Sequence, residues 1–85
     1  MIASQNQEIL VVIRKKLDKH FGEEDLNTIC FDLGIDYESL SGYGKAAKTR
    51  EMVIHCERMG ITEKLLAEVK SLRTNVDWPT LPKTS

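Results

Sequence analysis

The spacing of the apolar residues constrains the fold of this chain more than any other feature of its sequence. Apolar side chains recur every three or four positions along most of the chain, and no segment shows the alternation of a half-buried strand. This period places them on one stripe of an α-helix. The first stripe consists of Leu10, Ile13, Leu17 and Phe21. The sequence therefore predicts an all-α fold.

Residues that begin or end helices set the expected boundaries. We expect helices at residues 4–20, 23–33, 37–40 and 45–59, and a fifth that begins at Thr62. The connections are short, which predicts a compact antiparallel bundle of five to six helices. The signals are a capping box at Ser4 and Gln7, caps at Asp36 and Thr62, and terminating glycines at Gly34 and Gly60.

The same period predicts which side chains of the last two helices face the core. The inward set is Met52, Val53, Cys56 and Met59 in the fourth helix, and Leu65, Leu66, Val69 and Leu72 in the fifth. Ile54 lies about 160° from the stripe of its helix, so we expect it to be exposed.

The chain length of 85 residues corresponds to one small domain. The helical stripes stop after Arg73, and two prolines follow. We expect residues 1–78 to form the domain, with Val76 and Trp78 folded back on it, and residues 79–85 to be a linker or tail.

The stretch "SGYGKAAKTRE", residues 41–51, resembles a phosphate-binding loop only superficially. With Gly44-Lys45 as the G-K pair, the first glycine of the nucleotide motif would be residue 39, which is Ser39, and the magnesium ligand would be Ala46. A helix rather than a strand precedes it. Gly42 and Gly44 are better explained as a turn between helices. A cryptic nucleotide site is therefore disfavoured.

Other catalytic or metal-binding arrangements are not evident in the sequence. His55 and Cys56 are adjacent on a helix, so their side chains diverge, unlike the close ligand pairs of zinc sites. No nucleophile has an evident base and orienting partner. The predictions are no enzymatic activity, no cofactor and no metal, with Cys30 and Cys56 as buried thiols in a reducing cytoplasm. No apolar run is long enough to cross a membrane.

Charge is distributed very unevenly along the chain. The formal net charge is only −1, yet residues 23–38 carry a net charge of −6 and residues 45–73 a net charge of +3. We expect the acidic segment to be one interaction face and the fourth helix to carry a basic face around Ile54. The acidic face consists of Glu23, Glu24, Asp25, Asp32, Asp36 and Glu38, and the basic face of Lys45, Lys48, Arg50, Ile54 and Arg58.

Three explanations of this charge distribution remain open. Complementary faces on successive copies would support head-to-tail association into rings or filaments. Alternatively, the chain is a small helical domain that binds nucleic acid through its basic helix, although its acidic segment would repel phosphates. A solvated surface without a partner would also show separate charged faces.

Several short motifs together resemble a known family. They are Cys30-Phe31-Asp32-Leu33-Gly34, Gly44-Lys45 with Lys48, Arg50-Glu51, and Asp77-Trp78. The chain from about Leu10 to Trp78 resembles the bacterial effector-associated domains of type seven, of the death-like helical adaptor superfamily. Gly22 stands where a serine cap would be expected.

The resemblance implies a death-like bundle of about six helices without catalytic activity. Such domains are typically fused to proteases, NTPases or other effectors of prokaryotic conflict systems. The resemblance implies that they recruit partners through contacts between domains of the same fold. It assigns no interface residues in this chain.

Overall fold

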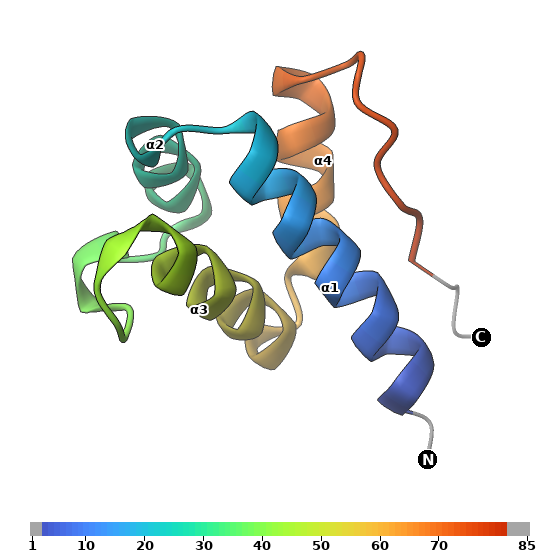
Figure 1. Ribbon diagram of the computed structural model, residues 1–85, viewed down its shortest axis with the longest axis horizontal. Coiled ribbons are helices and arrows are strands. Elements are labelled where there is room, and N and C mark those ends of the chain that lie inside the picture. Colours follow the sequence, from blue (N-terminus) through green and yellow to red (C-terminus); the bar gives the residue numbers. More distant parts are fainter. Residues whose placement is uncertain (1–2, 82–85) are drawn as a thin grey trace.

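The computed structural model describes residues 3–81, and its side chains from Gln7 onward. Its four α-helices and one short 3-10 helix confirm the all-α prediction (Figure 1). No sixth helix lies within residues 3–81. The elements are α1 (Ala3–His20), α2 (Glu23–Leu33), η1 (Tyr37–Ser39), α3 (Gly44–Met59) and α4 (Thr62–Leu72).

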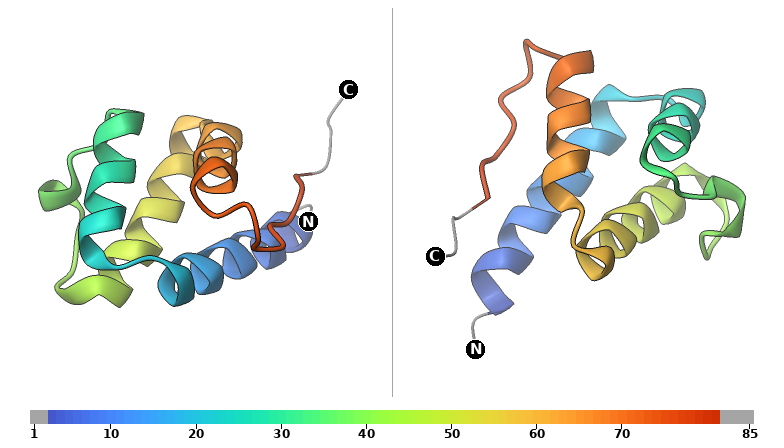
Figure 2. Two further views of the ribbon diagram at one scale, coloured as in Figure 1. Left: turned by 90° about the horizontal axis from the view of Figure 1, so that it is seen from above. Right: turned by 180° about the vertical axis from the view of Figure 1, so that it is seen from behind.

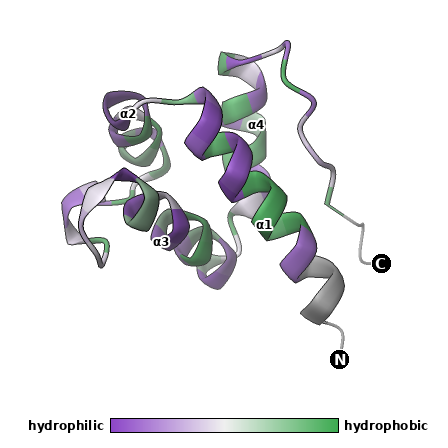
Figure 3. Cartoon of the chain, in the orientation of Figure 1, coloured by the Kyte–Doolittle hydropathy of each residue, from purple (hydrophilic) through white to green (hydrophobic). Residues whose placement is uncertain are grey.

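Helix α3 is the central element of the packing. It packs most extensively along α1 and also contacts α2 and α4, while α2 and α4 contact each other. Figure 2 shows the same arrangement from two further directions. The apolar stripes face inward between the helices (Figure 3), and together they form one core. Its fully buried apolar side chains include Ile13, Leu17, Leu26, Ile29, Met52, Leu65 and Val69.

The predicted helix ends are largely confirmed. Gly34 and Gly60 end α2 and α3 in the left-handed conformation. The Asp36 carboxylate accepts a hydrogen bond from the Glu38 amide at 3.2 Å and thus caps η1. Without a side chain at Gly22, only the Asp25 carboxylate caps the start of α2, by accepting the Gly22 amide at 3.1 Å.

The prediction that Thr62 caps the last helix is wrong. Ile61 occupies the cap position, and the Thr62 hydroxyl donates to the Glu57 carboxylate at 2.8 Å instead. Only Ile61 separates Gly60, which ends α3, from Thr62, which is the first residue of α4. The predicted capping box at Ser4 involves a side chain outside the described set.

Two side chains predicted to face the core are exposed. Met59 is 61% and Leu72 45% exposed. Each is the last residue of its helix. Periodicity gives the direction of a side chain, but it does not tell where the opposing helix stops covering the stripe.

The glycine turn before α3 is confirmed. Gly42 and Gly44 have φ angles of 89° and 86°, which an L side chain rarely adopts. A Cβ at Gly42 would also lie 2.7 Å from the Cβ of Ala47. The turn is therefore compact enough to bring the first turn of α3 against the loop.

Lys48 closes this loop through backbone contacts. Its ammonium donates to the carbonyl oxygens of Leu40 at 2.6 Å, and of Tyr37 and Glu38 at 3.2 Å each. These carbonyls lie in and just after η1, so a single cation on α3 holds the short helix in place. The same ammonium lies 5.6 Å from the centre of the Tyr37 ring.

The segment after α4 folds back on the helices, as predicted for Val76 and Trp78. The Trp78 ring stacks on Phe21 with 6.1 Å between centroids, and its indole N–H donates to the Arg73 carbonyl at 3.1 Å. Leu81 also packs against the core. Contacts thus extend beyond residue 78, and the proposed domain boundary there stays a prediction.

No helix within the described residues is both long and apolar enough to cross a membrane.

Replacing Trp78 with alanine tests the contribution of the returning segment. We expect Trp78→Ala to lower the free energy of unfolding by about 3 kcal/mol, because it removes a buried aromatic side chain and one hydrogen bond. Denaturant titration followed by circular dichroism measures the change. Tyr43→Ala, at a residue 98% exposed, is the matched control, with a change within about 0.5 kcal/mol. Equal losses in both variants would contradict the structure.

Replacing Lys48 with methionine tests the closure of the η1 loop. We expect Lys48→Met to cost about 1–3 kcal/mol, because three carbonyl oxygens lose a charged donor while the aliphatic stem is kept. Arg50→Met, on the same helix and largely exposed, provides the control. Similar denaturation midpoints for both variants would show that the Lys48 contacts do not stabilise the fold.

Candidate functional site

The six acidic residues predicted as one face are all exposed, but four of them, Asp32 included, have contacts within the fold. Asp36 caps η1, and Asp25 pairs with Arg73 at 3.4 Å. Glu23 accepts a hydrogen bond from the Tyr37 hydroxyl at 3.3 Å. Burial, followed by the Glu23 carboxylate, raises the pKa of Tyr37 to about 12. The acids on which no such contact is described are Glu24 and Glu38.

Asp32 forms a contact that sequence reasoning missed. It lies on α2 beside Glu68 of α4, and a hydrogen bond to Asp32 raises the pKa of Glu68, with smaller effects from burial and the Asp32 charge. Two carboxyl groups that meet in this way concentrate negative potential at the α2–α4 surface. Glu68 lies 36 positions along the chain from Asp32, so nothing in the sequence indicates the pair.

The predicted basic residues of α3 divide into two groups. Lys45 and Lys48 are half-buried and anchored: Lys45 donates to the Asp18 carbonyl at 2.6 Å, and Lys48 holds η1. Arg50 and Arg58 are exposed. The Arg50 guanidinium lies 3.5 Å from the adjacent Glu51 carboxylate. An ion pair exposed to solvent in this way contributes little to stability. The accessible basic surface is therefore smaller than the sequence predicted.

Ile54 lies at a hollow between α1 and α3. At 37% it is exposed, as predicted. The hollow has a volume of about 190 Å³. Arg50 and Arg14 contribute to its lining, whereas Arg58 does not. Sequence reasoning missed Arg14 because it treated α3 in isolation. The lining residues of this α1–α3 hollow are Gln7, Leu10, Val11, Arg14, Arg50, Val53 and Ile54.

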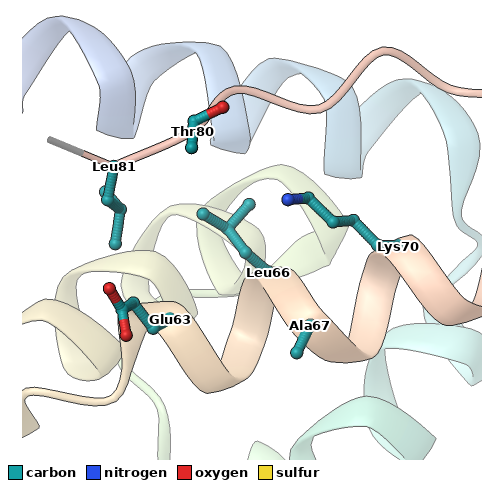
Figure 4. A pocket seen from close by; sticks show the side chains of 6 residues that line it. All are labelled: Glu63, Leu66, Ala67, Lys70, Thr80 and Leu81. Atoms are coloured by element: carbon teal, nitrogen blue, oxygen red, sulfur yellow. The ribbon is translucent and has the colours of Figure 1, made fainter. Parts of the chain in front are cut away.

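A second hollow lies between α4 and the returning segment. It measures about 280 Å³, and Figure 4 shows Leu81 directed toward α4, with Leu66 and Lys70 on the helix side. Thr80 and Leu81 of the returning segment form one wall of this hollow.

A third hollow surrounds the glycine turn, at the stretch that resembled a phosphate loop. It measures about 420 Å³ and includes Gly42, Gly44 and Lys48. The Lys48 ammonium is already held by carbonyl oxygens, so a phosphate would have to compete with these contacts. This arrangement disfavours a nucleotide site.

The two cysteines are free and buried in the core. Burial raises the pKa of Cys30 to about 11 and that of Cys56 to about 12, and the Cys30 thiol donates to the Met52 sulfur at 3.1 Å. Both are therefore neutral thiols near pH 7, unlike reactive thiolates. Within the described residues, no group of three or more His, Cys, Asp or Glu side chains could hold a metal ion.

The Asp32–Glu68 contact predicts a pH-dependent effect on stability. Since folding raises the pKa of Glu68, the contact favours the fold below the usual carboxyl pKa, and this contribution is lost as pH rises through the folded pKa. Compared with the wild type, we expect Glu68→Gln to unfold at a higher denaturant concentration at pH 7. At pH about 3 the two proteins should have nearly the same denaturation midpoint. Glu8→Gln, at an exposed site on α1, is the control. A destabilised Glu68→Gln protein at pH 7 would refute this sign.

Comparison with known proteins identifies one family. The family described as effector-associated domain 7 matches residues 13–74, well over half of the chain. No curated protein matches, and no solved structure matches. The matched region runs from the middle of α1 to just beyond α4 and includes most of the buried core, but not Trp78. The chain therefore belongs to the effector-associated domain 7 family.

Proposed function

We propose that this domain is a non-catalytic adaptor that recruits or clusters effectors of a prokaryotic conflict or immune signalling system. Family membership carries the proposal: an effector-associated domain is a module that accompanies an effector. Its partners are domains of the same fold, either copies of itself or domains on other proteins. The recruited or fused effector belongs to a class such as proteases or NTPases, and the setting is the cytoplasm.

The fold and the surface are consistent with this role. A small all-α domain offers several helical faces for contacts with neighbouring domains. The described hollows lie at the surface between helices or beside the glycine turn, and the two thiols are neutral and buried. Such a surface supports binding of a partner better than it supports chemistry.

Charge supports contacts that join unlike faces. The exposed carboxylates Glu24 and Asp32 lie on α2, whereas the exposed guanidinium of Arg50 lies on α3 near Arg14 of α1. Opposite charges on separate faces steer one domain onto the next and set the orientation of the contact. When such contacts repeat, they produce oligomers or filaments.

Binding of nucleic acid is the alternative function. It requires a cluster of accessible cations on one face. Two of the four predicted cations on α3, Lys45 and Lys48, instead hold backbone carbonyls. This reduces the positive surface available for phosphates and favours the adaptor function.

Charge reversal at Arg50 tests the proposed contacts. We expect the wild-type domain to associate with increasing concentration in low salt, and Arg50→Glu to weaken association by at least about tenfold, or ~1.4 kcal/mol. Light scattering coupled to size-exclusion chromatography measures the mass, and circular dichroism verifies the fold.

Lys19→Glu provides the matched control, because Lys19 is exposed and lies near the C-terminal end of α1, away from the α1–α3 hollow. It makes the same change in charge and is expected to leave association nearly unchanged. A wild-type domain that remains monomeric at all concentrations would contradict self-association. Binding of DNA that weakens steeply with salt would favour the alternative.

A further inference from the structure

Phe31 is an exposed aromatic side chain without a structural role in the described fold. It lies on α2, and 81% of its surface is accessible. Tyr43 is also exposed, but it lies between the two glycines of the turn before α3 and carries a hydroxyl that can hydrogen-bond to water. A phenyl ring has no such group, and burying it in a partner would remove a large apolar area from water.

The surface around Phe31 is acidic. Asp32 follows it directly, and Glu24 precedes it by seven positions, which places Glu24 on the same side of α2. Glu68 of α4 adds a further carboxyl group beside Asp32. Phe31 is therefore an apolar projection on an acidic helix surface, with Asp32 next to it in the chain and Glu24 about 10 Å away along the helix axis.

The α1–α3 hollow has the complementary properties. Its lining combines the aliphatic side chains of Leu10, Val11, Val53 and Ile54 with the polar or charged side chains of Gln7, Arg14 and Arg50. Its volume of about 190 Å³ lies below the ~300–1,000 Å³ typical of small-molecule pockets. That size suits one inserted side chain. The guanidinium groups in its lining can lie against an aromatic ring and pair with carboxylates beside that ring.

Arg14 and Arg50 form few ion pairs within the domain. Arg50 contacts only the neighbouring Glu51 among the described carboxylates, at 3.5 Å. Across residues 7–81, no carboxylate lies within 4.0 Å of a charged nitrogen of Arg14. An incoming acidic surface would therefore not have to break a buried ion pair at this site.

The acidic projection and the hollow lie on different parts of the molecule. Helix α2 is at the upper left of Figure 1, whereas the N-terminal half of α1, which contributes Gln7 to Arg14, extends to the lower right. Phe31 is carried by the rigid helix α2, so it cannot reach the hollow of its own chain. The matching surfaces can meet only between two copies.

We propose that Phe31 of one copy inserts into the α1–α3 hollow of a second copy, with Glu24 and Asp32 facing Arg14 and Arg50. This inference rests on the proposed adaptor function and assigns the contact. Because the two surfaces differ, every copy in a pair retains one unused projection and one unused hollow, and further copies can add head to tail. The arriving arginines would also relieve the repulsion between Asp32 and Glu68.

A complementation experiment tests this contact. One variant, Phe31→Ala, lacks the projection but keeps the hollow. The other, Arg14→Glu with Arg50→Glu, keeps the projection and reverses the charge of the two arginines that line the hollow. We expect each variant alone to associate at least about tenfold more weakly than the wild type, as loss of a central aromatic or charged anchor requires. An equimolar mixture should form a dimer and nothing larger, measured by light scattering in low salt.

Tyr43→Ala serves as the matched aromatic control and should associate like the wild type. Circular dichroism shows whether each variant is folded, and Phe31→Ser replaces any Phe31→Ala sample that is not. Wild-type association that persists in both variants overturns the Phe31 contact but leaves the adaptor function in place. Defective variants that do not complement overturn the head-to-tail arrangement, and a monomeric wild type overturns self-association altogether.

Discussion

The burial of one face of α3 is the constraint on which the rest of the structure depends. Thr49, Met52, Val53 and Cys56 are buried, and α3 contacts α1, α2 and α4. A chain of 85 residues has few apolar side chains for a second core. All elements must therefore pack around this one helix. The opposite side of α3 remains at the surface, where Arg50 and Ile54 meet α1 beside the hollow.

The charged residues serve two purposes in this small domain. Some hold the fold: Lys45 and Lys48 bind carbonyl oxygens, and Arg73 joins the His20 carbonyl, the Asp25 carboxylate and the Phe21 ring. Others, including Glu24 and Arg50, lie at the surface and form few or no side-chain contacts in the described structure. Only the second kind can contribute to partner binding without loss of stability, so a linear charge count overstates the interaction surface.

Much of the fold could be predicted from local sequence. Helical periodicity identified α1 to α4 and the short helix after Asp36, and Gly34 and Gly60 marked two helix ends correctly. The exposure of Ile54 and the return of Trp78 were also predicted. Predictions failed at Thr62, Met59 and Leu72, where the outcome depends on how the neighbouring elements are placed. The death-like arrangement remains a prediction.

The sequence by itself determined the helices, their buried stripes and the family, because these depend on residue spacing and on local turn and capping chemistry. Only the tertiary structure decided the surface. It placed Arg14 beside Arg50, brought Glu68 to Asp32, and directed Lys48 to the carbonyls of η1. These contacts join residues between 8 and 36 positions apart, and they depend on how the helices pack rather than on where each helix begins.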